Sequence, residues 1–166
     1  MNMVSRALAR RQKGEKGFTL VELLVVVIII GILAAVSVPI YLNQRKSAWN
    51  SNAEQDVKNA QVQVETAMTA NNGKLPFDKA VSCDGDDSAK AKVALAASGD
   101  GDAQITCSPG VTVTVTPATT GKDAGLTYTI TGSHKNGTKT YTYDSSKDSS
   151  VQVADKKAAA TPSATA

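Results

Sequence analysis

One carboxylate, Glu22, lies near the start of the longest apolar segment of the chain. An ionised side chain inside a membrane span costs about 2.5–3.5 kcal/mol at the helix centre and less near an interface, so it needs a partner. Cleavage of the chain before Phe18 would supply one, because the new α-amino group would lie four residues from Glu22, which is one turn of a helix. Residues 17–23 therefore suggest a peptide cleavage followed by an ion pair, within one chain or between neighbouring chains.

The charge of the chain is unevenly distributed. Residues 1–17 hold three Arg and two Lys against one Glu, a net charge of +4, whereas the whole chain carries +3. Residues 18–166 are thus slightly acidic, and the basic isoelectric point does not indicate nucleic-acid binding by that part. A basic leader directly before an apolar segment predicts a cytoplasmic N-terminus with the rest of the chain outside.

The apolar segment is long enough to cross a bilayer. Every residue of 23–36 is apolar or Gly, and Ser37 interrupts the segment only briefly before Leu42. About 20 such residues match the hydrocarbon thickness of a membrane, so we expect residues 18–42 to form a spanning helix.

Two simpler interpretations of this segment explain less. An ordinary secretory signal has an apolar core of about 7–15 residues and a small-residue cleavage site, and this segment is longer and has no such site. A plain single-span anchor explains the span and its orientation. It does not explain the boundary between Gly17 and Phe18, nor the carboxylate of Glu22.

Residues 13–45 resemble the signature of type IV prepilins and their pseudopilin relatives. In this resemblance Gly17 precedes the cleavage point, Phe18 is the new N-terminus, and Glu22 is the acidic residue five positions into the mature chain. The resemblance implies that a membrane-embedded prepilin peptidase removes the leader, residues 1–17, and N-methylates Phe18. Glu22 and the amine of a neighbour's Phe18 would then select one register between assembling helices.

After the span the pattern becomes amphipathic, as in a helix with one face on a core. The apolar residues that recur every three or four positions are Trp49, Ala53, Val57, Ala60, Val64 and Ala67. Charged residues, among them Asp56, are expected on the remaining surface. Residues 71–73, Asn-Asn-Gly, are a stop signal because Asn and Gly adopt the left-handed conformation of a helix cap. We expect one helix from Phe18 to about Ala70, with residues 43–72 as its amphipathic half.

Pro39 falls inside this helix and cannot donate a hydrogen bond to the carbonyl of Ala35, so we expect a kink there. Gly31, two turns earlier, loosens the same stretch. The kink is either an ordinary feature of a membrane helix or, as the family resemblance implies, a segment that partly unwinds when subunits pack.

Residues 73–155 are expected to form an exported domain. Valine and threonine alternate over residues 111–116, which predicts a strand with one buried face. Three further segments alternate in the same way, at residues 126–130, 141–143 and 151–153. We therefore expect an α+β fold of the type IV pilin kind, in which the C-terminal half of the long helix packs on a small antiparallel sheet of about four strands. Residues 156–166 are expected to be a flexible tail.

Some polar motifs of this domain have two interpretations. Tyr128, Tyr141 and Tyr143 keep the apolar phase of their strands, which favours a core face over a stack for nucleic-acid bases. Residues 136–138 match a glycosylation sequon, but Asn-Gly is first a hairpin signal. His134, alone in a polar turn, supports no site.

Two cysteines, Cys83 and Cys107, follow the span. The oxidising environment outside the membrane favours a disulfide between them, with two free buried thiols as the alternative. Aspartates at residues 84–87 and 100–102 lie in the enclosed loop. They do not follow the EF-hand pattern, so solvated turns are favoured over calcium sites.

The chain shows no His–acid pair beside a nucleophile motif, no phosphate-binding loop and no metal-ligand cluster, so we expect no enzyme activity, cofactor or metal.

The resemblance implies a structural subunit of a type IV pilus, a filament polymerised from membrane-stored monomers that supports adhesion, motility or DNA uptake. Its implied partners are other copies of itself, the prepilin peptidase, the inner-membrane assembly machinery, and membrane lipid before assembly, with no direct nucleic-acid site. The subunit would first be a single-pass membrane protein and then part of an extracellular pilus. A pseudopilin of a secretion or competence apparatus and a monomeric membrane-anchored binding domain stay open as alternatives.

Overall fold

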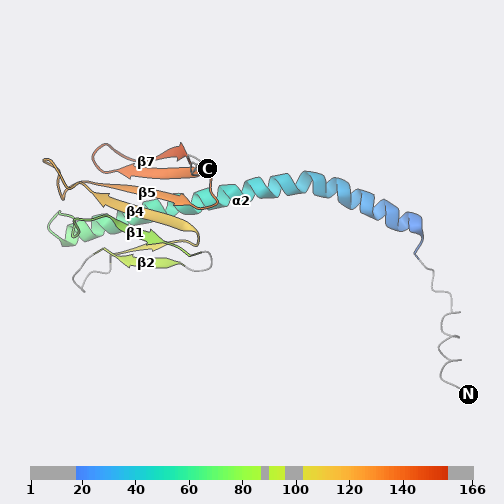
Figure 1. Cartoon of the computed structure of the whole chain (residues 1–166), viewed down its shortest axis with the longest axis horizontal. Coiled ribbons are helices and arrows are strands. Elements are labelled where there is room, and N and C mark those ends of the chain that lie inside the picture. The colour runs from blue at the N-terminus through green and yellow to red at the C-terminus, as the bar shows by residue number, and fades with distance from the viewer. Residues whose placement is uncertain (1–17, 87–89, 96–102, 157–166) are drawn as a thin grey trace, which may run out of the picture. The chain divides into compact units, whose positions relative to one another are not determined.

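The computed structural model describes residues 18–86, 90–95 and 103–156 (Figure 1). Within these ranges, one helix is followed by seven strands: α2 (Leu20–Ala70), β1 (Val81–Asp84), β2 (Ala91–Ala94), β3 (Gln104–Cys107), β4 (Val111–Pro117), β5 (Tyr128–His134), β6 (Lys139–Asp144) and β7 (Asp148–Asp155). The chain divides into two compact units, Met1–Leu42 and Asn43–Ala166. The α+β fold expected from the sequence is confirmed.

The helix ends where the stop signal predicts. Asn72 and Gly73 both have positive φ, 57° and 80°. The Gly73 N–H donates to the carbonyl of Met68 at 2.8 Å, which satisfies one of the carbonyls left open at a helix C-terminus.

Within the second unit, the sheet has five strands in the order β1-β4-β5-β6-β7, and every neighbouring pair is antiparallel. Strands β4 to β7 are the four expected from the alternating pattern, although β5 begins at Tyr128 and leaves Leu126 outside it, 45% exposed. Strand β1 is an additional edge strand, and β2 with β3 forms a separate two-stranded sheet. These three strands were not predicted. Each has only four residues, the shortest stretch over which alternation can be recognised, although Ile105 and Cys107 of β3 do alternate with polar residues.

The core of this unit lies between one face of the sheet and the amphipathic half of α2. The helix contributes the buried residues Ala53, Val57, Ala60, Val64 and Ala67. The sheet contributes Val111, Val113, Val115, Ile130, Tyr141 and Tyr143. Gly132 on β5 permits close approach of the helix, because a Cβ there would collide with Cγ2 of Val57. The predicted apolar stripe is confirmed at these five helix positions, and Trp49 is only half-buried.

Candidate functional site

The first turn of α2 is closed by a capping box. The backbone N–H of Thr19 donates to Oε2 of Glu22 at 2.9 Å, and the Thr19 hydroxyl donates to the same oxygen at 2.8 Å. In return the Glu22 N–H donates to Oγ1 of Thr19 at 3.2 Å. Thr-x-x-Glu before an apolar run is a sequence signature of a helix start, and the carboxylate also favours the positive end of the helix. Glu22 therefore has an internal partner, Thr19, that the sequence analysis missed although the pattern was visible there.

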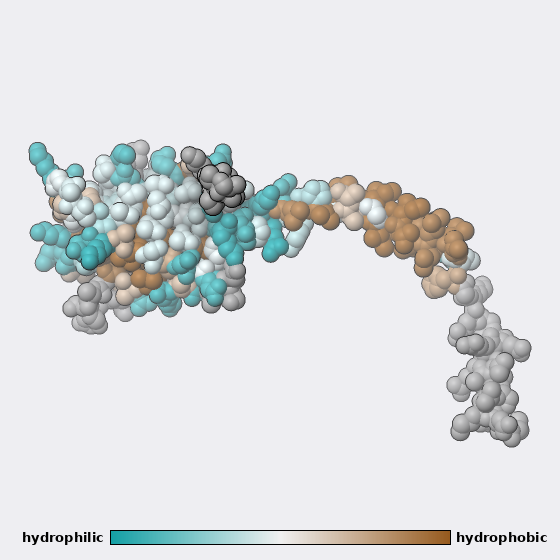
Figure 2. Space-filling view, in the orientation of Figure 1, coloured by the Kyte–Doolittle hydropathy of each residue, from teal (hydrophilic) through white to brown (hydrophobic). Residues whose placement is uncertain are grey.

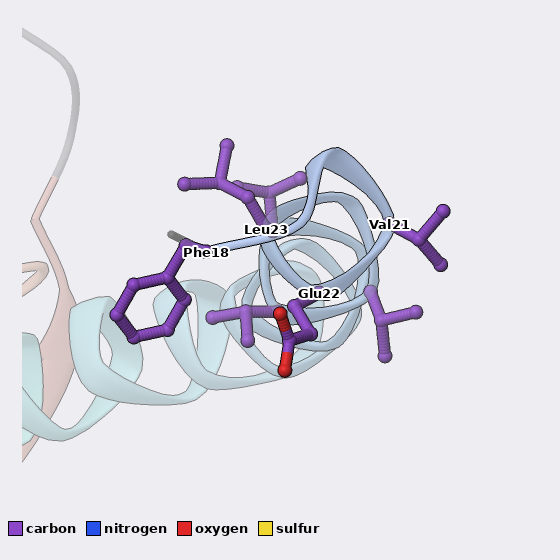
Figure 3. A pocket seen from close by; sticks show the side chains of 7 residues that line it. Phe18, Val21, Glu22 and Leu23 are labelled. Carbon is purple, nitrogen blue, oxygen red and sulfur yellow. The ribbon is translucent and has the colours of Figure 1, made fainter. Parts of the chain in front are cut away.

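Glu22 and Phe18 border the same apolar groove. The groove has a volume of about 630 Å³, and Val21, Leu23 and Val25–Val27 complete its lining. Figure 3 shows the Glu22 carboxylate and the Phe18 ring on one side of the helix, while Val21 points away from both. Phe18 is 90% exposed. In the intact chain its nitrogen is part of a peptide bond to Gly17, so the ammonium proposed as a partner of Glu22 does not exist before cleavage. Gly17 and the rest of the leader lie outside the described residues.

The segment after the groove presents its apolar side chains outward on all sides. Each large apolar residue from Leu20 to Leu42 is at least 48% exposed, and Figure 2 shows a mostly hydrophobic surface on the visible face of this part of the helix. Among the described residues, α2 is the helix long and apolar enough to cross a membrane. A helix that is apolar all round requires lipid or other protein around it.

The helix runs through Gly31 and Pro39 without interruption. The Ser37 hydroxyl donates to the carbonyl of Leu33 at 2.8 Å, a contact that is common in bent helices. Space around Gly31 is open, since a Cβ there would have no neighbour within 4 Å. A functional kink at these positions stays a prediction.

The disulfide between Cys83 and Cys107 is present, with Cα atoms 6.1 Å apart. It joins β1, the edge of the five-stranded sheet, to β3 of the two-stranded sheet. Asp84, next to Cys83, accepts a hydrogen bond from the Thr112 hydroxyl at 2.7 Å. Within the described residues, no group of three or more His, Cys, Asp or Glu is placed to hold a metal ion.

The tyrosines of the sheet are buried, as the strand phase predicted. Tyr128, Tyr141 and Tyr143 are 3%, 4% and 5% exposed. The hydroxyl of Tyr128 donates to Oε1 of Glu65 at 3.3 Å. Burial and the neighbouring Glu65 both raise the pKa of Tyr128 above its ordinary value. A stack for nucleic-acid bases is therefore not available on these rings.

Two expectations about polar residues were wrong. The charge pattern predicts Asp56 on the surface, but it is buried and accepts hydrogen bonds from the Ser108 N–H at 2.6 Å and the Ser108 hydroxyl at 3.1 Å. Burial raises the pKa of Asp56, against the opposing effect of the hydrogen bonds from Ser108. His134 was considered isolated, but it is 4% exposed and stacks on Trp49 with ring centroids 5.3 Å apart.

Asn50 is a third polar residue that the sequence analysis missed. It is 9% exposed, and its side chain hydrogen-bonds the β5–β6 turn to the helix. Its Oδ1 accepts from the backbone N–H groups of Thr138 and Lys139 at 2.9 and 3.2 Å, and its Nδ2 donates to the Thr138 hydroxyl at 3.0 Å. The signal was its spacing, because Asn50 precedes Ala53 and Val57 in the buried phase of the helix. The Asn136-Gly137 pair lies in this turn, where the Gly137 N–H donates to the His134 carbonyl at 3.0 Å, so the hairpin interpretation of the sequon is confirmed.

The N-terminal part of the chain is similar to known proteins. The family described as "Prokaryotic N-terminal methylation motif" matches residues 12–38. A "Fimbrial protein" of Pseudomonas aeruginosa is 41% identical over 56 residues, which are 34% of this chain and 36% of that protein. "Type IV major fimbrial protein FimA" of Dichelobacter nodosus is 41% identical over 54 residues, 32% of this chain and 35% of that protein.

"Fimbrial protein EcpB" of Eikenella corrodens is 36% identical over 62 residues, 37% of this chain and 38% of that protein. The matched stretch thus spans little more than a third of the length of these relatives. No solved structure is significantly similar to the chain.

Proposed function

We propose that the chain is a member of the type IV pilin and prepilin family and the structural subunit of a type IV pilus. The observation that carries the proposal is Glu22, a carboxylate capped by Thr19 at the start of a helix whose next 20 or so residues expose only apolar or small side chains. Residues 12–38, which match the methylation motif, include this site and the expected cleavage point.

In the proposed mechanism the uncleaved chain is stored in the membrane as a monomer. The basic leader holds the N-terminus on the cytoplasmic side. The capping box gives the Glu22 carboxylate two hydrogen-bond donors within its own chain, the N–H and the hydroxyl of Thr19. Prepilin peptidase then cuts between Gly17 and Phe18, removes the +4 leader and N-methylates the new amine, which stays cationic.

Cleavage changes what Glu22 can bind. Apolar helices in lipid gain little from the hydrophobic effect on association, so packing and polar contacts decide how they assemble. The Phe18 ammonium of a neighbouring copy is a charged donor, and Glu22 would accept from it more strongly than from the neutral hydroxyl of Thr19. The pair acts mainly as a register device, because it distinguishes one alignment of otherwise uniform apolar surfaces.

The kink is a further part of the proposal. If the stretch between Gly31 and Pro39 unwinds during packing, Pro39→Ala should change filament formation or stretching. Unchanged filaments from this variant would leave only an ordinary membrane-helix kink.

The experiment that tests the proposal is to express the chain in cells that carry the pilus assembly machinery, shear them, and determine the N-terminus of the chain in the sheared material. We expect long extracellular filaments built of a chain that begins at N-methylated Phe18. A chain that is processed but stays in the cell envelope would favour the pseudopilin alternative. A chain that still begins at Met1 would leave only the monomeric membrane-anchored domain.

A further inference from the structure

A polar groove opens on the second unit, directly after the apolar segment in sequence. It has a volume of about 660 Å³ and lies between the helix and the β5–β6 turn. Helix residues at one face line it, among them Asn43, Lys46, Ser47 and Ser51, and Lys139 lines it from the start of β6. The groove thus combines two ammonium groups with hydroxyl and amide donors, which is the donor set that a phosphate group requires.

The groove is held in shape by a buried side chain. Asn50 forms part of its wall and binds the backbone of Thr138 and Lys139 through the hydrogen bonds described above. These contacts fix the start of β6 against the helix. The backbone of Lys139 is therefore held on the opposite side of the groove from Lys46, so binding of an anion would order the two lysine side chains but would not have to order the strand.

The two lysines have no anionic partner in the part of the chain that the structure describes, since neither belongs to an ion pair there. Glu54 also lines the groove, but its carboxylate is engaged by Lys58 one helical turn away. Asp155 lies opposite Lys139 in the β6–β7 register, but no ion pair joins these two described residues. The side chains of Lys46 and Lys139 are exposed and can reach a ligand.

The position of the groove in the sequence indicates what the anion is. Asn43 directly follows Leu42, where the apolar segment ends. The headgroup layer on each side of a bilayer is about 5–8 Å deep, which is about three to five residues of helix at 1.5 Å each. With the span ending at Leu42, residues 43–47 fall at the depth of lipid phosphates. Asn50, which holds the backbone of Lys139, lies about 12 Å beyond Leu42 along the helix, so the long side chain of Lys139 has to extend toward the membrane to reach the same phosphate.

Cations at this point also run against the usual pattern. Short segments on the exported side of a span are poor in Lys and Arg, yet Arg45 and Lys46 follow the span at once. Arg45 lies over the Trp49 ring at 4.8 Å, and Lys46 is the one of these two cations that lines the groove.

We propose that this groove binds the phosphate of an anionic phospholipid headgroup while the subunit is stored in the membrane. Lys46 and Lys139 supply the charge, and Ser47, Ser51 and Asn43 supply neutral donors. The inference rests on the membrane-stored monomer of the proposed function, and it does not require that the chain later polymerises.

The test uses the full chain in lipid nanodiscs that contain equal amounts of phosphatidylglycerol and phosphatidylcholine, with native mass spectrometry of the lipids retained on the released chain. We expect the wild type to retain phosphatidylglycerol in preference to phosphatidylcholine. Lys46→Gln/Lys139→Gln should reduce this preference on the order of tenfold, since a lysine near an anionic surface contributes about 1 kcal/mol, which is about fivefold in affinity. Lys74→Gln/Lys92→Gln is the matched control, because it removes the same charge from exposed sites outside the groove.

The proposal would be overturned if Lys46→Gln/Lys139→Gln retained phosphatidylglycerol with the same preference as the wild type. An equal loss in the Lys74→Gln/Lys92→Gln control would overturn it as well, because the attraction would then be a general effect of net charge. A third arm adds excess inorganic phosphate. Displacement of the lipid with retention of free phosphate would assign the groove to soluble phosphate and not to lipid. A chain that does not insert into the nanodisc at all would instead refute the membrane-stored monomer, so the two failures are distinguishable.

Discussion

Thr19 and Glu22 satisfy each other at the start of α2, through three hydrogen bonds of 2.8–3.2 Å between their hydroxyl, carboxylate and backbone N–H groups. This arrangement needs the amide N–H of Thr19, which cleavage before Phe18 leaves intact. The same carboxylate is therefore available in two situations, capped within its own chain or facing a neighbour's ammonium. One substitution can remove the charge of Glu22 and another the hydroxyl cap of Thr19. Comparing them tests whether the charge or the cap is needed for assembly.

We predict that Glu22→Gln abolishes most filament assembly although the amide oxygen of Gln can still accept from Thr19. The reason is that a neutral side chain cannot pair with the cationic Phe18 amine. Cleavage should be unaffected, because the residues on both sides of the cut are unchanged. The measurement is the yield of sheared filaments, together with the fraction of the chain that begins at Phe18.

Thr19→Ala is the matched variant. It removes the hydroxyl cap, which costs about 1 kcal/mol of helix stability, and it leaves the charge of Glu22. We expect filament yield close to wild type. A wild-type yield from Glu22→Gln together with a loss in Thr19→Ala would assign the role of Glu22 to capping alone and contradict the register mechanism.

The fold could be predicted wherever a period is long enough to be seen. α2 has 51 residues, and β4 to β7 have six to eight residues each, so their apolar phases are visible in the sequence. Strand β1 has one buried residue, Cys83, among four. A single buried position has no period, and only the paired strand β4 identifies it as a strand.

The candidate site was predictable in part for the same reason. Glu22 stood out because a lone carboxylate in an apolar run is chemically anomalous. The helical spacing of Asn50 places it in the buried phase, but local pattern does not reveal its partner Thr138, which lies 88 residues away. The burial of Asp56 could not be predicted from local pattern, because its partner Ser108 lies 52 residues away. A polar residue can be buried only when such a distant partner satisfies it, and local composition does not contain that information.

We predict that replacing both cysteines, Cys83→Ser/Cys107→Ser, lowers the free energy of unfolding of the second unit by about 3 kcal/mol, because a loop of this length loses that much closure entropy in the unfolded chain. Since the disulfide joins β1 to β3, the β2–β3 sheet should lose amide hydrogen-exchange protection before the β4–β5 pair does. Urea unfolding and hydrogen exchange measure the two effects. Equal loss of protection in both sheets would show that the bridge acts only through the unfolded state.

We predict that Asn50→Ala destabilises the β5–β6 turn and costs about 1–3 kcal/mol, because two backbone N–H groups and the Thr138 hydroxyl lose their partner. The control is Asn59→Ala on an exposed position of the same helix, which should change stability by less than about 0.5 kcal/mol. Both are read from thermal or urea unfolding. Similar stability of the two variants would mean that water replaces Asn50 at the turn.

Because the pKa of Asp56 is raised, we predict an unusual pH dependence for the free energy of unfolding of the second unit. Burial raises its pKa above the model-peptide value of 3.8, so the folded chain holds this proton more tightly than the unfolded chain does. The stabilisation from protonated Asp56 is therefore complete below about pH 4 and is lost as the pH rises through the higher pKa of the folded state. Asp56→Asn keeps an acceptor for Ser108 and should remove this component. The measurement is the free energy of unfolding of wild type and variant over the acidic range, where their difference should change above pH 4 and not below it.

Asp144 lies in the same unit, and its lowered pKa makes stability depend on pH in the opposite direction. Hydrogen bonds from Ser146 and from Lys147 lower its pKa to about 2, so its stabilising effect is present above about pH 4 and is lost as the pH falls through 2. Asp144→Asn should remove that acidic component and leave the component of Asp56. If the two substitutions altered the pH profile in the same window and direction, the assignment to burial for Asp56 would be wrong.

The close approach of helix and sheet predicts a specific coupling between Gly132 and Val57. Gly132→Ala should destabilise the second unit by about 1–3 kcal/mol, because the added methyl group overlaps Cγ2 of Val57 in a filled core. Val57→Ala removes that methyl group, so the double variant should be more stable than the sum of the two single changes, by about 0.5–3 kcal/mol. Val113→Ala is the control partner, since Cγ2 of Val113 would lie at an ordinary contact distance of 3.5 Å from the new Cβ. The measurement is a double-mutant cycle for each pair. Rescue by Val57→Ala and not by Val113→Ala would locate the strain at the helix. Additive effects for both pairs would contradict a coupling between Gly132 and Val57.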